Sequence, residues 1–148
     1  MAKLLTSILI PAPRECVWRV LTDFEGYPKW NPYVRRIRGE LRLGQTLEVT
    51  VSPPGGMART FSPTVTCVQP ETEFRWAWGM GSPWLFLGEH IFTLKTEASK
   101  QTRFIHHEDF TGCLTFLHRI FRYEVTRSGF EAMNVALQAQ FAAPANER

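Results

Sequence analysis

The sequence of 148 residues has few cysteines and no long hydrophobic run. Cys16, Cys67 and Cys113 lie far apart and form no CxxC pair, which argues against a disulfide framework and suits reduced thiols in a cytoplasm. The apolar stretch at residues 4–10 ends at a proline and is too short for a signal peptide. No run approaches the ~20 apolar residues of a membrane span. We therefore expect a cytoplasmic protein without stable membrane insertion.

The sequence also has little net charge. A formal charge of +3 at pH 7 gives no reason to expect nucleic-acid binding unless the basic residues form a concentrated patch. Four arginines cluster near residue 38 and could attract an anionic head group, a membrane surface or an acidic partner. They could equally form a solvated face on an outer strand. These residues are Arg35, Arg36, Arg38 and Arg42.

Aromatic and hydrophobic residues are plentiful by contrast. They make up 13% and 44% of the chain, and they include 11 Phe and 5 Trp, which is enough to fill or line an interior. The length suits one globular domain over residues 1–148 and leaves no room for a second.

The C-terminal residues 114–141 are predicted to form the one long helix. Apolar residues recur there at intervals of three and four, which places them on one helical face. They are Phe130, Met133, Leu137 and Phe141. The polar residues expected to face water are Glu131, Asn134 and Gln138.

The phase of this apolar pattern changes upstream. Four earlier apolar residues point away from the face that carries Phe130 and Leu137 if the helix is straight. They are Phe116, Leu117, Ile120 and Phe121. Either the helix bends between Arg122 and Gly129, or its first turns cover a different surface. We favour the bend, which would leave space beneath the helix.

The rest of the chain is predicted to be mostly strand. The predicted strands cover residues 3–10, 34–40, 46–51, 59–68, 73–79, 85–96 and 102–110. A helix is expected at residues 14–22, and a short helix or structured turn at 23–32. Hairpin-length gaps make the sheet antiparallel, with about seven strands. A long amphipathic helix after such strands buries its apolar face against the sheet.

Alternation along the strands indicates which side chains share a face, because successive residues point to opposite sides. We assign three sets to the helix side, since their aromatic residues need cover. They are Phe86, His90, Phe92 and Leu94; Phe104, His106, Glu108 and Phe110; and Phe74, Trp76 and Trp78.

Five segments in order resemble the START-like superfamily, also called SRPBCC, which includes polyketide cyclase and dehydrase-like proteins. They are VWRVLTDFEGYPKWNPYV at 17–34, RIRGELRLGQTLEV at 36–49, GEHIFTL at 88–94, TRFIHHEDFTG at 102–112 and FEAMNVAL at 130–137. The resemblance implies an α+β helix-grip fold. In it, a curved antiparallel sheet grips the long C-terminal helix, two short helices follow the first strand, and an apolar tunnel receives hydrophobic molecules. Activities in this superfamily include lipid and hormone binding, cyclase chemistry and accessory roles with other proteins, so function must be argued from the site.

Three residues are the candidates for acid–base catalysis: His90, His106 and Glu108. A histidine and a carboxylate in a dry cavity can exchange protons with a ligand, and burial raises a carboxylate pKa toward neutrality. The alternative is that they satisfy buried polar partners. A metal site is not expected, because His107 and Asp109 point to the opposite face from His106 and Glu108. No cofactor is expected either.

Eight apolar residues are the candidates for contact with a ligand, although each could instead simply pack the core. They are Trp76, Trp78, Trp84, Phe92, Phe104, Phe130, Met133 and Leu137.

Three hypotheses about function follow from these residues and the resemblance. The first is a binder of a hydrophobic small molecule such as a lipid, an isoprenoid or an aromatic polyketide-like compound. The second is a cyclase or dehydratase, and the third is a protein-interaction module. The sequence leaves the ligand's identity and the oligomeric state open.

Overall fold

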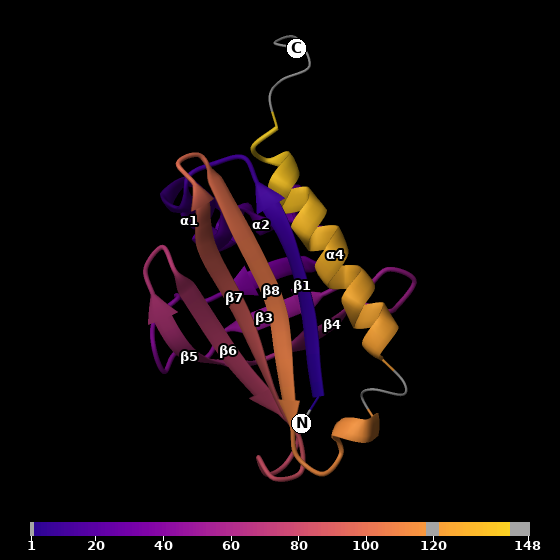
Figure 1. The fold of residues 1–148 in the computed structure, drawn as a ribbon. Helices are drawn as coiled ribbons and strands as arrows, with labels where there is room; N and C mark the ends of the chain where they lie inside the picture. Colours follow the sequence, from indigo (N-terminus) through magenta and orange to yellow (C-terminus); the bar gives the residue numbers. More distant parts are fainter. Residues whose placement is uncertain (1, 118–121, 143–148) are drawn as a thin grey trace.

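A computed structural model describes residues 2–117 and 122–142 of the chain (Figure 1). Its strands are β1 (Ala2–Ile10), β2 (Val34–Arg38), β3 (Glu48–Val51), β4 (Arg59–Phe61), β5 (Thr64–Gln69), β6 (Glu73–Gly79), β7 (Leu87–Ala98) and β8 (Gln101–Thr111). Its helices are α1 (Arg14–Thr22), the 3-10 turn η1 (Phe24–Gly26), α2 (Tyr27–Trp30) and α4 (Tyr123–Ala139). The predicted helix at residues 14–22 and the predicted strand at 73–79 are confirmed to the residue.

The strands form two antiparallel sheets. The larger has the order β1-β8-β7-β6-β5, and the smaller has the order β2-β3-β4. Figure 1 shows the smaller sheet crossing behind the larger one and α4 running alongside β1. Both sheets, α1 and α4 contribute side chains to one buried apolar core. In the described residues, no helix is both long and apolar enough to cross a membrane.

The predicted strand at residues 59–68 is wrong, because the chain breaks there into β4 and β5. Ser62 and Pro63 separate the two, and proline has no N–H to donate to a strand ladder. β4 pairs with β3, whereas β5 pairs with β6. The chain therefore passes from the small sheet to the large one at this proline, and residues 2–117 and 122–142 contain eight strands where about seven were predicted.

The single helix predicted at residues 114–141 is also wrong in extent. α4 begins at Tyr123 and continues unbroken to Ala139, so the position predicted for the bend, between Arg122 and Gly129, spans the start of one continuous helix. A separate helical turn covers residues 115–117. The change of phase in the apolar pattern thus coincides with the start of a new helix. Phe116 and Leu117 are largely exposed, and the predictions for Ile120 and Phe121 lie outside the described residues.

The apolar face of α4 is where the sequence places it. Phe130, Met133 and Leu137 are fully buried. Gly129 lies on the same side, and a Cβ atom at this position would overlap the ring of Tyr33. The missing side chain lets α4 pack closely against the segment that leads into β2.

Candidate active site

The register of β7 and β8 brings the three candidate catalytic residues together. His90 is the cross-strand partner of Glu108, and Phe92 is the partner of His106. All four side chains are buried. The alternation predicted that these residues share the helix side of the sheet, and the structure places them there.

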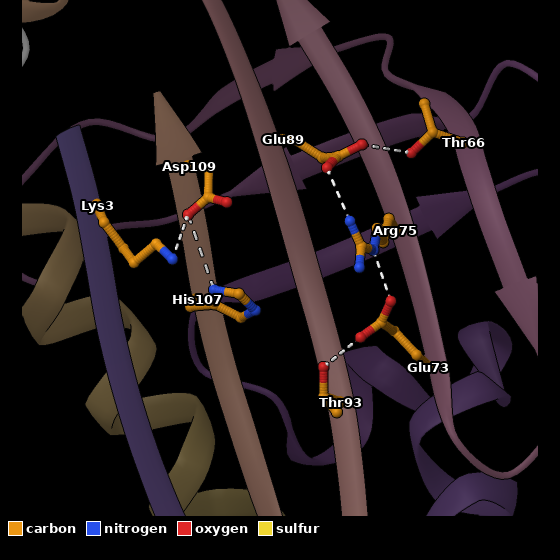
Figure 2. Close-up of polar contacts among 8 residues, drawn as sticks. All are labelled: Lys3, Thr66, Glu73, Arg75, Glu89, Thr93, His107 and Asp109. Carbon is orange, nitrogen blue, oxygen red and sulfur yellow. Dashed lines mark hydrogen bonds and ion pairs between the residues drawn. The ribbon is translucent and has the colours of Figure 1, made fainter. Parts of the chain in front are cut away.

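The opposite face of the same strands carries a separate polar network (Figure 2). Arg75 donates to Glu73 at 2.5 Å and to Glu89 at 3.2 Å. Asp109 lies 3.7 Å from the Lys3 ammonium and 3.8 Å from His107. His107 and Asp109 therefore stand apart from the buried histidines, as the alternation predicts. Within the described ranges, no three His, Cys, Asp or Glu residues gather as a metal site would require.

A chain of hydrogen bonds links β1, α4, β8 and β7 through buried side chains. Thr6 Oγ1 donates to the backbone oxygen of His106 at 2.8 Å, and Asn134 Nδ2 donates to Thr6 Oγ1 at 2.9 Å. Asn134 Oδ1 lies 2.9 Å from His106 Nδ1. His106 Nε2 in turn lies 2.6 Å from His90 Nε2. Four side chains from four elements thus form one continuous path.

The backbone oxygen of His106 determines which atom donates and which accepts in each hydrogen bond of this series. A backbone oxygen can only accept, so the Thr6 hydroxyl donates to it and must accept from the Asn134 amide. The Asn134 oxygen therefore faces His106 Nδ1, which must carry a proton. His106 Nε2 is left as the acceptor, so His90 Nε2 carries the proton. The lone pair of neutral His90 is then on Nδ1, which hydrogen-bonds to none of the described residues.

Burial keeps both histidines neutral. It lowers the pKa of His90 well below its ordinary value of 6.5, and the neighbouring His106 lowers it further. Burial also lowers the pKa of His106 to about 3, although the hydrogen bond with Asn134 opposes this shift. His106 stacks on Phe130 with ring centroids 3.9 Å apart, which leaves no room for water over that face.

Glu108 is the buried acid next to this pair. Burial raises its pKa from 4.5 to about 7, while a hydrogen bond from Trp78 and the charge of Arg59 oppose the rise. Trp78 Nε1 donates to Glu108 Oε1 at 2.6 Å. Near pH 7 the carboxyl group therefore exists in both protonation states, as a group that exchanges protons must.

His90 and Glu108 both line a cavity of about 240 Å³ between the two sheets and α4, which we call the main cavity. Its other polar walls come from Arg59, Thr60 and Thr126. The remaining walls are Tyr33, Val51, Phe61, Trp78, Gly79 and Met80. A second cavity of about 290 Å³, the side cavity, shares Arg59, Trp78 and Met80 with the first. Each volume lies just below the ~300–1,000 Å³ range of small-molecule sites, which suits a small ligand.

The predicted ligand-contact residues divide into three groups. Trp78 lines both cavities. Trp84 is 70% exposed and lines neither. The others are buried in the core and are not among the residues that line the two cavities: Trp76, Phe92, Phe104, Phe130, Met133 and Leu137. Of the candidate catalytic residues, His106 lies behind His90 and does not reach the cavity wall.

Sequence reasoning missed several residues of the site. Asn134 was expected to face water, but it is buried and central to the hydrogen-bond chain. Its spacing gave a usable signal, because it lies four residues after Phe130 and three before Leu137, on the apolar face. Tyr33 and Arg59 come from outside the large sheet, and only the tertiary fold brings them to the cavity.

Because of Glu108, the protein should lose stability as pH rises. Its pKa is about 7 in the folded protein and 4.5 in a free chain, so the folded state holds the proton over that window. The protonated Glu108 carboxyl group stabilises the folded state fully below pH 4.5, and this contribution is lost as pH rises through 7. Relative to Glu108→Gln, the wild-type free energy of unfolding should fall by about 3 kcal/mol across this range. Urea titrations of both proteins at several pH values measure the free energy of unfolding. The contribution of the histidines to its pH dependence cancels in the comparison, because both proteins contain them. Parallel curves would contradict the assignment.

Comparison with known proteins identifies the fold. Solved structures of low sequence identity superpose over nearly the whole chain. A START superfamily protein from Mycobacterium smegmatis is 18% identical, with a TM-score of 0.73 over 94% of this chain and 96% of that one. The aromatase/cyclase Zhui from Streptomyces sp. R1128 is 17% identical, with a TM-score of 0.75 over 94% and 92%. Norcoclaurine synthase from Thalictrum flavum, solved with dopamine and hydroxybenzaldehyde, is 13% identical, with a TM-score of 0.70 over 94% and 85%.

These likenesses confirm the predicted helix-grip, START-like fold. No curated protein matches the chain. One family model, described as polyketide cyclase / dehydrase and lipid transport, matches residues 1–144. Because that match covers almost the entire sequence, the chain belongs to this family.

Proposed function

We propose that the protein binds a hydrophobic small molecule in the main cavity. The observation that carries this proposal is the space itself, since side chains from the two sheets and α4 surround about 240 Å³ without filling it. Family membership supports the same conclusion, because the family description includes lipid transport. A filled cavity would have favoured the interaction-module hypothesis, in which the same surface grips a partner protein, whereas the open space favours a small-molecule ligand.

The walls favour a flat ring system over a long alkyl chain. The rings of Phe61 and Trp78 lie 5.8 Å apart in a tilted arrangement, and Tyr33 lines the same cavity. Removing ~200 Å² of apolar ligand surface from water contributes roughly 5 kcal/mol at ~25 cal/mol per Å². A bicyclic aromatic compound is a suitable size. An aromatic polyketide-like compound therefore fits better than an extended lipid.

Filling the cavity should weaken binding of a neutral bicyclic probe, 2-(1-naphthyl)ethanol. Thr126 is buried on the cavity wall of α4, whereas the adjacent Val125 is exposed and lines neither cavity. Thr126→Phe should weaken binding at least about tenfold, equivalent to 1.4 kcal/mol or more. Val125→Phe is the matched control and should bind like the wild type.

Calorimetric titration measures the affinities, and circular dichroism confirms that both variants fold. Native mass spectrometry of gently purified wild-type protein provides an independent check for a retained hydrophobic compound. Equal binding by Thr126→Phe and the wild type would place the probe elsewhere and reject the proposal.

A second candidate function is acid–base catalysis on the bound compound. The observation that favours it is the pairing of His90 with Glu108 on adjacent strands of one cavity wall. The His90 Nδ1 lone pair would take a proton from a carbon next to a ketone, and protonated Glu108 would donate its proton to the ketone oxygen. The product is an enol, and the reverse transfers restore the ketone. Enolisation of this kind begins ring closure and dehydration of poly-keto chains.

Deuterium exchange at C2 of 1-tetralone tests this chemistry without knowledge of the natural substrate. The wild type in D2O should accelerate exchange over buffer, as followed by proton NMR. Glu108→Gln and His90→Gln should each reduce the enzyme-dependent rate about 100-fold, a typical contribution of a positioned acid or base. Both variants should still bind the ketone.

Glu89→Gln is the matched control, because Glu89 neighbours His90 on β7 but points to the opposite face (Figure 2). Its exchange rate should equal that of the wild type. Exchange no faster than in buffer, or unaffected by Glu108→Gln, would exclude catalysis and leave the binding proposal standing.

A further inference from the structure

Arg59 is a cavity-lining cation whose buried Nε has no hydrogen-bond acceptor among the described residues. It belongs to β4 and lines both the main and the side cavity. It is half-buried, and its Nε is fully buried without a partner among the described residues. A guanidinium has five N–H donors, and leaving buried donors unpaired is unfavourable. The described residues around Arg59 therefore leave at least one buried donor, Nε, without an acceptor.

A second arginine lies close to the first. Arg122 also lines the side cavity, and its charge contributes to lowering the pKa of Arg59, after the larger effect of burial. In the part of the chain that the structure describes, neither arginine is in an ion pair with a carboxylate. Two guanidinium groups thus approach one another at a cavity without a fixed counter-charge.

The acidic groups nearby do not neutralise this pair. Glu108 acts on Arg59 electrostatically, but burial favours its protonated form, and its Oε1 accepts from Trp78. Glu124 lies in the first turn of α4, where it is exposed. Arg122 itself is the N-cap residue of α4 and provides no side-chain cap. The free N–H groups of this helix end add further positive potential beside the side cavity.

We propose that Arg59 and Arg122 bind an oxyanion carried by the ligand. The ligand is then a hydrophobic acid, with a carboxylate or a phosphate ester in the side cavity and an apolar ring system in the main cavity. This arrangement gives the buried Nε of Arg59 an acceptor and points the rings toward His90 and Glu108. The proposal rests on the proposed binding function, and it adds the chemical class of the ligand.

Three probes that share a naphthalene ring test the effect of negative charge on the ligand. They are the neutral 2-(1-naphthyl)ethanol, the anion of 1-naphthylacetic acid (the acetate) and 1-naphthyl phosphate. At least one anion should bind the wild type about tenfold or more tightly than the alcohol, because charge-assisted bonds to guanidinium are strong. A preference for the acetate indicates a carboxylate ligand, and a preference for the phosphate indicates a phosphate ester. Arg59→Gln and Arg122→Gln should each bring the ratio of anion affinity to alcohol affinity close to one, because each removes a guanidinium that the anion uses and the neutral alcohol does not.

Arg42→Gln is the matched control for net charge, since Arg42 is exposed and already paired with Glu40 at 2.7 Å. It should bind all three probes like the wild type. Arg122→Gln changes an exposed side chain, so it keeps the test valid even if Arg59→Gln fails to fold. Equal affinity of the wild type for alcohol and anions, or an anion preference that survives Arg122→Gln and Arg59→Gln, would overturn this proposal alone. Failure of all three probes to bind would overturn the binding function and this proposal together.

Discussion

The site depends on one hydrogen-bond chain that begins at a backbone oxygen and ends at His90. A backbone oxygen can only accept, so the polarity of Thr6, Asn134 and His106 is fixed in turn. Buried polar groups are stable when they are satisfied, and each side chain from Thr6 to His90 Nε2 has a hydrogen-bond partner in this series. These hydrogen bonds also join β1, α4 and the hairpin formed by β7 and β8. They therefore fix the position of α4 and the protonation state of the site together.

Burial gives the site one group that can accept a proton, His90, and one group that can donate a proton, Glu108. His90 is neutral because burial opposes its charge, and Glu108 retains a proton to about pH 7 for the same reason. In water the histidine would be the weaker acid, but burial reverses that order. A base and an acid thus coexist on adjacent strands without forming an ion pair. On the outer face of the same strands, solvent-accessible acids pair with Arg75 and Lys3 instead (Figure 2).

Local patterns in the sequence predicted the parts of the site that depend on one or two neighbouring strands. Alternation placed His90, His106 and Glu108 on one face, because the period of a strand is two and needs no tertiary information. Turn residues and hydrophobic periodicity predicted the order of the elements and the position of the long helix, and the family resemblance then indicated how they pack. The break at Pro63 was also readable from the sequence, since proline interrupts a strand ladder, but the surrounding β-branched residues obscured it.

The rest required contacts between distant segments. β1 pairs with β8 about a hundred residues away, and no local pattern sets that register. Asn134 was misread because a polar side chain on a helix usually faces water, and only the partners Thr6 and His106 make its burial favourable. Arg59 belongs to a three-residue strand of the small sheet, and its place at the cavity follows from how the two sheets cross.

The most direct test of this account is the tautomeric state of the two buried histidines. Long-range proton–nitrogen NMR correlations of the imidazole rings report which nitrogen of each ring carries the proton. The account predicts neutral rings at pH 7, with the proton on Nδ1 of His106 and on Nε2 of His90. A proton on Nδ1 of His90, or a charged imidazolium at either position, would contradict it.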